Sequence, residues 1–323
     1  MTKPLLAALM LFAAALPGST RAAYPDRPIT MIVPFAAGGP TDVIARIVAE
    51  NMSKTLGQQI VVENVAGAGG TTGILRGAQS KPDGYTIMMG HMGTHGAAPA
   101  VYPELKYDPV KDFEPIGLAA GTPILIVAKK DFPAKDLKEF VAYVKANSEK
   151  LNEAHAGVGS VSFTTCSLLN SMLGAKPTRV VYRGTGPALN DLVAGQVDYM
   201  CDQIVNLVPQ IQAKTIKAYA VALPERSPAL PDVPTTKEGG LAEYQVSAWN
   251  AIFAPKKTPK DIVKKLNGAL LKAIEDPTTS KRLLDLGGDL SNKEARTPEG
   301  LRKHVQSEVQ RWNKVLKQTG QAK

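Results

Sequence analysis

Residues 29–50 read ITMIVPFAAGGPTDVIARIVAE, and the fold prediction starts from this segment. Its first five residues, ending at Val33, have the apolar and β-branched character of a buried strand, which Pro34 ends. Pro40 suits the first position of a helix because its missing N–H costs nothing there. The Asp42 carboxylate then falls where it can cap free backbone amides. The stretch predicts a strand, a bare loop and a helix, which is the repeating unit of an α/β fold.

The loop between this strand and helix consists largely of small residues, Ala36, Ala37, Gly38 and Gly39. Such a loop leaves the backbone open, and the positive end of the helix dipole points at the same place. One interpretation is a binding site for a carboxylate or a phosphate. The other is an ordinary tight connection in an α/β domain, and this stretch alone favours neither.

The composition is that of a soluble globular protein. The chain has 323 residues, 44% of them hydrophobic and 21% charged, and its length is enough for two domains with separate cores. The formal net charge is +9, with basic residues scattered along the chain. This distribution is typical of a solvated surface rather than of a nucleic-acid interface, so we expect no nucleic-acid partner.

The first residues have the pattern of a secretory signal. Lys3 precedes an apolar run at 5–16, and the small residues around Arg21 predict cleavage after Ala22. The apolar run is too short to span a bilayer, and no later stretch of the sequence is long enough. Removing residues 1–22 takes away Lys3 and Arg21 and no acidic residue, so the charge of +9 becomes +7. We expect an exported, soluble protein.

A strand followed by a glycine-rich or polar loop recurs along the chain. Strands predicted at 60–63 and 85–89 run into loops, and an extended run at 114–128, broken by Gly121-Thr122-Pro123, is expected to enter a second domain. In open α/β sheets, ligands bind at the edge where such loops gather. The other predicted elements are strands at 154–159, 180–182, 197–200, 216–221 and 246–253, and amphipathic helices at 136–147, 259–274 and 298–316.

The sequence carries no recognisable catalytic motif. The serine-hydrolase pattern G-x-S-x-G is absent, and GAGGTTG at 67–73 matches neither G-x-G-x-x-G nor a phosphate-binding P-loop. His91 and His95 have the spacing of metal ligands on a helix, but glycines at 90, 93 and 96 argue against a helix. We therefore expect a receptor rather than an enzyme, with no cofactor and no metal ion.

The sequence has two cysteines, Cys166 and Cys201. Export into an oxidising compartment favours a disulfide between them, which is the interpretation we prefer. The alternative is a pair of buried free thiols.

Several segments resemble the solute-binding proteins of tripartite tricarboxylate transporters, the Bug family. They are YPDRPI at 24–29, VPFAAGGPTD at 33–42, VEN at 62–64, PDGYT at 82–86, FEPI at 113–116, YRG at 182–184, PDVPT at 231–235 and FAPKKTP at 253–259. The similarity runs from about residue 24 to residue 316. GHMGTH at 90–95 and Asp202-Gln203 look most like the branch associated with aspartate.

The resemblance implies an α/β periplasmic binding protein of type II with two lobes, each a mixed sheet flanked by helices. Lobe 1 would comprise 23–121 together with a return crossing and C-terminal helices at 225–323, and lobe 2 would comprise 122–224. Such a protein is expected to act in the periplasm as a monomer, close around a carboxylic acid and deliver it to membrane permease subunits. An alternative is a sensory binding protein that signals ligand occupancy to a membrane receptor; an enzyme with an unrecognised site is a third hypothesis.

The resemblance also implies a set of ligand-binding residues. Because the loops at 35–41 and 157–167 contain no basic residue, we expect backbone amides and hydroxyl groups to do most of the recognition. Many members of the family have histidine where Phe163 stands, so its ring either faces the ligand and admits an aromatic acid or packs inward. The ligand is therefore expected to be a dicarboxylate, an acidic amino acid such as aspartate, or an aromatic acid. The expected site residues are Phe35, Ala37, Gly38, Gly39, Thr41, Gly69, Gly90, His91, Gly159, Ser160, Ser162, Phe163, Arg183, Gly184, Thr185 and Asp202.

Overall fold

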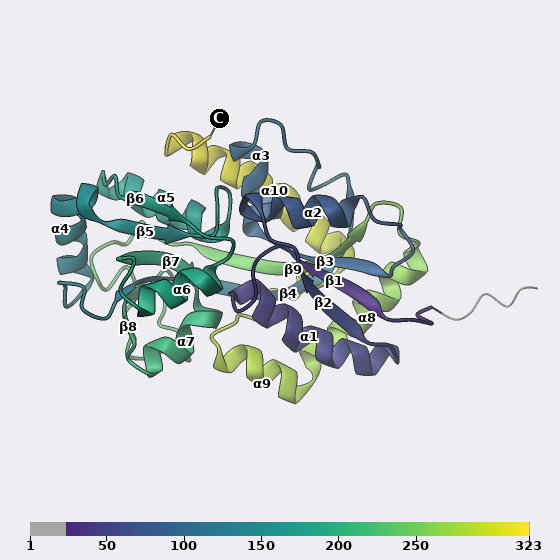
Figure 1. Ribbon diagram of the computed structural model, residues 1–323. Helices are drawn as coiled ribbons and strands as arrows, with labels where there is room; N and C mark the ends of the chain where they lie inside the picture. The colour runs from purple at the N-terminus through teal and green to yellow at the C-terminus, as the bar shows by residue number, and fades with distance from the viewer. Residues whose placement is uncertain (1–23, 323) are drawn as a thin grey trace, which may run out of the picture.

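The structure, a computed structural model, describes residues 24–322, so the signal segment predicted at 1–22 lies outside the described residues (Figure 1). Nine strands form one sheet: β1 (Ile29–Val33), β2 (Ile60–Asn64), β3 (Thr86–His91), β4 (Phe113–Lys129), β5 (Asn152–His155), β6 (Thr178–Val181), β7 (Tyr199–Gln203), β8 (Ile216–Val221) and β9 (Ser247–Pro255). The strand order is β2-β1-β3-β9-β4-β7-β5-β6, and β8 pairs with β4 off this path.

Helices cover both faces of this sheet (Figure 1). They are α1 (Pro40–Leu56), α2 (Thr71–Ala78), α3 (Ala98–Val101), α4 (Leu137–Asn147), α5 (Val161–Leu173), α6 (Thr185–Val193), α7 (Ile204–Gln212), α8 (Lys260–Glu275), α9 (Pro277–Asp285) and α10 (Pro298–Gln318). Among residues 24–322, none of the helices combines the length and the hydrophobicity needed to cross a bilayer.

The sheet has two halves built on the same plan, as the recurring strand-loop pattern predicted. In the first half β1 lies between β2 and β3, and all three are parallel. In the second half β5 lies between β6 and β7, again all parallel. Figure 1 shows the first half at the right and the second half at the left. Some boundaries differ. Strand β7 continues to Gln203, whereas the sequence predicted that it ends at Met200, and β5 ends at His155, whereas the strand was predicted at 154–159.

The long strand β4 joins the two halves. Its first part pairs with β9 up to Pro123, and its second part, from Ile124 onward, pairs with β7 and β8. The predicted break at Gly121-Thr122-Pro123 is therefore wrong, and the strand is continuous. Its pairing with β9 has register shifts near Gly117 and Ala120 but is regular from Gly121 to Pro123. Gly121 also exchanges backbone hydrogen bonds with Asp289.

The segment between β8 and β9 packs on the second half of the sheet. Thr235 forms a bridge with Val221 of β8, and Tyr244 Oη donates to the Thr165 carbonyl of α5 (3.1 Å). The chain thus returns to the first half at β9, about twenty residues after the expected boundary at 225. The turn-rich sequence of this segment concealed its packing because such segments usually run over the surface.

The hydrophobic cores are divided by the faces of the sheet rather than by its halves. Met31 and Val33 point to one face and belong to the cluster that includes residues of α1 and α8. Ile32 points to the other face and belongs to the cluster that includes residues of α5 and α10. Both clusters contain residues from both halves. The expected pair of separate domain cores is therefore not what the structure has.

Three helical segments were missed or misjudged. Helices α7 and α9 were not predicted, and Pro209 lies inside α7. Residues Met92–Ala97 form a π-helical turn that leads into α3, although their glycines argued against a helix. This wide turn is held by its first residue, since His91 and Thr94 cap each other's backbone amides.

Candidate functional site

The first residues of three helices converge on one small cavity between the two halves. Helix α1 comes from the first half, and α5 and α6 come from the second. The cavity has a volume of about 20 Å³ available to the centre of a water molecule. It is lined by Phe35, Gly39, Pro40, Thr41, His91, Ala156, Ser160, Val161, Ser162, Thr185 and Asp202. The positive ends of three helix dipoles at one place favour a bound anion.

The start of α1 has the form that the sequence predicted. Gly39 is the N-cap residue, Pro40 is the first helical residue, and Asp42 Oδ2 accepts the Gly38 amide (3.1 Å). That bond removes Gly38 from the amides available to a ligand, which corrects its expected role as a donor. The amides of Gly39 and Thr41 have no acceptor within residues 24–322.

The start of α5 contributes hydroxyl groups. Ser160 is the N-cap residue, and its Oγ accepts the Phe163 amide (3.2 Å). Ser162 Oγ accepts the amide of Ala156 (3.0 Å) and lies 3.3 Å from Ser160 Oγ. One of the two hydroxyls can donate to the other, and the O–H group of the second then remains able to donate towards the cavity.

His91 lines the cavity as a neutral imidazole. Burial lowers the pKa of His91 to about 4, and its ring stacks on Phe35 with the ring centroids 4.9 Å apart. Its Nδ1 accepts the Thr94 amide (3.1 Å), so the proton of the neutral ring lies on Nε2. The side chain therefore offers one N–H donor and no charge.

Asp202 is the one carboxylate among the lining residues. It lies near the end of β7 with 1% of its surface exposed, and burial raises the pKa of its carboxyl to about 6. Asn206 Nδ2 donates to Asp202 Oδ2 (3.3 Å). Asp202 Oδ1 has no hydrogen-bond partner among the described residues.

A buried hydrogen-bond network lies beside the cavity, where the crossing strands meet. Thr41 Oγ1 donates to Asn250 Oδ1 of β9 (3.0 Å), and Asn250 Nδ2 donates to Gln203 Oε1 of β7 (2.7 Å). Thr122 of β4 also donates to Gln203 Oε1 (2.7 Å). The Thr41 hydroxyl proton is thus committed to Asn250, so Thr41 can serve an anion through its amide alone. The sequence interpretation missed Asn250, although it is a lone polar residue in the apolar run VSAWNAIF.

Several expected glycines mark close approaches of the two halves rather than the wall of the cavity. A Cβ on Gly69 would lie 1.8 Å from the Val158 carbonyl oxygen, and one on Gly184 would lie 2.9 Å from the Ala36 amide. Gly159 packs against Val101 in the same way. Gly90 is different, because a Cβ there would meet the His95 ring at 2.4 Å within the first half.

The Phe163 ring does not line the cavity. It packs edge-to-face against His155, with the ring centroids 5.2 Å apart, and the Arg179 guanidinium carbon lies 4.9 Å from the centre of the Phe163 ring. Phe163 is therefore buried inside the second half, and the ring that the sequence interpretation offered to an aromatic acid is already in contact with protein.

Arg183 and Ala37 also lie outside the lining. The Arg183 side chain is exposed, and its carbonyl oxygen accepts the Ala36 amide across the two halves (3.0 Å). Arg183 therefore contributes its backbone to the contact between the halves. The residues that line the cavity without having been predicted are Pro40, Ala156 and Val161.

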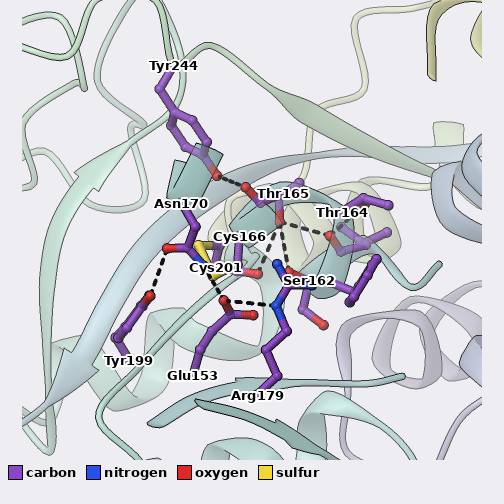
Figure 2. The surroundings of a disulfide bond; sticks show 12 residues. Glu153, Ser162, Thr164, Thr165, Cys166, Asn170, Arg179, Tyr199, Cys201 and Tyr244 are labelled. Carbon is purple, nitrogen blue, oxygen red and sulfur yellow. Dashed lines mark hydrogen bonds and ion pairs between the residues drawn. A yellow bond between two sulfur atoms is a disulfide. The ribbon is translucent and has the colours of Figure 1, made fainter. Parts of the chain in front are cut away.

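Cys166 of α5 and Cys201 of β7 are joined by a disulfide (Figure 2). Figure 2 also shows a buried polar group beside it, in which Asn170 connects Tyr199 and Glu153. The bridge fixes the helix that carries Ser160 and Ser162 to the strand that carries Asp202. Among residues 24–322, no group of three or more His, Cys, Asp or Glu side chains is arranged so that it could hold a metal ion.

Comparisons with known proteins agree with this architecture. The family model for the tripartite tricarboxylate transporter family receptor matches residues 44–321. The chain belongs to this receptor family. Family members are solute-binding receptors rather than enzymes, and the fold is accordingly that of an α/β periplasmic binding protein.

Solved structures of this receptor family superimpose closely on the chain. MatC from Rhodopseudomonas palustris with bound malate is 52% identical, with a TM-score of 0.88 over 91% of this chain and 100% of that chain. The periplasmic binding protein BugD is 44% identical, with a TM-score of 0.90 over 93% and 99%. Rpa4515 from R. palustris with adipate is 31% identical, with a TM-score of 0.87 over 92% and 98%.

Proposed function

We propose that this protein is a periplasmic receptor that captures a small dicarboxylate or acidic amino acid for the membrane permease subunits of a tripartite tricarboxylate-type transporter. The convergence of the α1, α5 and α6 starts on one cavity carries the proposal. Backbone amides at helix starts have no partner inside the helix and suit a carboxylate oxygen. The malate in MatC and the adipate in Rpa4515 support a carboxylic acid as the ligand class.

An aromatic acid is the less favoured ligand. The small cavity and the contacts of the Phe163 ring with His155 and Arg179 argue against a site built to stack a second ring. The lining residues also include no lysine or arginine. Recognition would then depend on amides, on the Ser160 and Ser162 hydroxyls, and on His91 Nε2–H.

We propose that the two halves of the sheet are the lobes and that they close by a hinge at β4 and β9. These strands cross between the halves, and the amides and hydroxyls that face the cavity come from both sides of the crossing. The signal segment would be removed after Ala22, and the mature protein would act in the periplasm as a monomer.

A thermal-shift screen of mono-, di- and tricarboxylates, acidic amino acids and aromatic acids tests the ligand class. A ligand at a hundredfold excess over its dissociation constant stabilises the native state by about 2.7 kcal/mol. We expect dicarboxylates or acidic amino acids to raise the melting temperature by about 5 °C. The proposal fails if no aliphatic acid raises the melting temperature and none shows binding in calorimetry.

A further inference from the structure

Asp202 is a buried carboxylate with an unused acceptor atom. Its Oδ2 accepts a hydrogen bond from Asn206. Its Oδ1 has no partner in the described part of the chain, and the side chain lines the cavity. Removing a carboxylate oxygen from water without supplying a hydrogen-bond donor is unfavourable. With a pKa of about 6, this carboxyl is mostly ionised at pH 7.5, so Oδ1 is then an acceptor and nothing else.

The hydrogen-bond donors that line the cavity are largely committed to, or suited to, acceptors other than Asp202. The lining side chains include no cation, and the Thr41 hydroxyl is already donated to Asn250. His91 Nε2–H and the free amides at the helix starts suit an anionic ligand. The Thr185 hydroxyl is the remaining lining donor beside Asp202, and hydrogen bonding from it offsets part of the rise in the pKa of this carboxyl. Among the described residues Oδ1 still has no partner within hydrogen-bond distance, so a donor on the ligand would satisfy it.

We propose that Asp202 Oδ1 is the specificity-determining acceptor of the cavity, and that it selects acids with a hydroxyl or ammonium donor on the carbon next to a carboxylate. This inference rests on the proposed function, and it narrows the ligand class. Helix starts would take the carboxylate, while Asp202 on the neighbouring strand would take the donor. An acid without that donor would still bury the Asp202 carboxylate but would leave Asp202 Oδ1 unpaired.

Isothermal titration calorimetry of the mature protein at pH 7.5 with L-malate, L-aspartate and succinate tests the proposal. These acids share a four-carbon chain and two carboxylates and differ at the second carbon. We expect succinate to bind at least about tenfold more weakly than the better of the other two, because it leaves a buried acceptor unpaired. Tighter binding of malate identifies the donor as a hydroxyl group, and tighter binding of aspartate identifies it as an ammonium group.

Asp202→Asn assigns the preference to this side chain. Asn206 Nδ2 requires an acceptor, so the new amide should turn its carbonyl oxygen to Asn206 and its NH₂ group to the cavity. A donor then faces a donor, and we expect the preference over succinate to fall below about threefold or to reverse. Asp202→Ser also removes the free carboxylate oxygen and should lose the preference too. Asp131→Asn is the matched control, since it removes an exposed carboxylate of the same half and should keep the preference.

The outcomes separate this inference from the function on which it rests. If none of the three acids, and no other carboxylate, binds the wild-type protein, the proposed function fails. If succinate binds the wild-type protein as tightly as malate and aspartate do, the role of Asp202 is refuted and the receptor function stands. Retention of the full preference by either folded Asp202 variant refutes it as well. Circular dichroism and melting temperature establish folding, and the wild-type affinity ratio decides if neither variant folds.

Discussion

Replacing Glu153 by glutamine is expected to stabilise the protein at pH 8 and not at pH 4. Glu153 lies on β5 with 0% of its surface exposed, and its Oε1 has no partner in the described chain. Its Oε2 accepts from Asn170 and lies 4.0 Å from Arg179 Nε (Figure 2). Burial nevertheless dominates and raises the pKa of the Glu153 carboxyl from 4.5 to about 7.

The magnitude follows from the two pKa values of Glu153. Since the folded protein holds this proton more tightly than the unfolded chain, the stabilisation is complete below pH 4.5 and is lost as the pH rises to about 7. This difference of about two and a half pH units corresponds to about 3 kcal/mol. Glutamine stays neutral and avoids the loss, but its NH₂ group lacks an acceptor, which costs about 1 kcal/mol. We expect a net gain of about 1–3 kcal/mol at pH 8.

Denaturant unfolding of the mature protein at pH 4, 6 and 8 measures this effect. Glu149→Gln is the matched control, because Glu149 is exposed in the same half and its loss changes the net charge equally. The control should shift the unfolding free energy by less than about 0.5 kcal/mol at each pH. The reasoning is refuted if Glu153→Gln changes stability by the same amount at pH 4 and pH 8, or destabilises the protein at pH 8.

Three further predictions concern the site and its frame. Gly39→Val should weaken ligand binding about 10- to 100-fold, because a Cβ at this position would already lie 3.2 Å from Thr185 Oγ1. Arg183 is exposed, so Arg183→Ala should change the affinity less than about threefold. The opposite order of the two effects in calorimetry would rule out recognition by amides. Alkylation without reductant should leave the exported protein's mass unchanged, and two modified thiols would disprove the Cys166–Cys201 bridge. Small-angle scattering should show a smaller radius of gyration at saturating ligand, and an unchanged radius would contradict hinge closure.

The local elements of the site could be predicted because short sequence signals determine them. The α1 start follows from Pro40 and Asp42 alone, and its cap has the predicted form. The repeated strand-loop plan followed equally from apolar runs and glycine-rich loops. Resemblance to the receptor family brought Ser160, Ser162 and Asp202 into the candidate set, and all three line the cavity.

Features that depend on long-range pairing could not be predicted in this way. The direction of the Phe163 ring depends on His155 and Arg179, which lie on separate strands, and no periodicity reports such a contact. The capture of the Gly38 amide by Asp42 is a local contact instead, because the two residues are four apart, and it makes this amide unavailable to a ligand. Continuity of β4 through Pro123 likewise requires its partners β7, β8 and β9.

The polar contacts between the two halves are compatible with the hinge closure proposed above. They include three neutral hydrogen bonds: Tyr102 Oη to the Val158 carbonyl (2.8 Å), the Ala36 amide to the Arg183 carbonyl (3.0 Å), and Asn250 Nδ2 to Gln203 Oε1 (2.7 Å). No ion pair within residues 24–322 joins the halves. Each neutral bond replaces bonds to water and contributes only about 0.5–1.5 kcal/mol net. If the halves close by the proposed hinge, a ligand held by helix starts from both halves would add free energy comparable to these bonds together and would shift the population to the closed form.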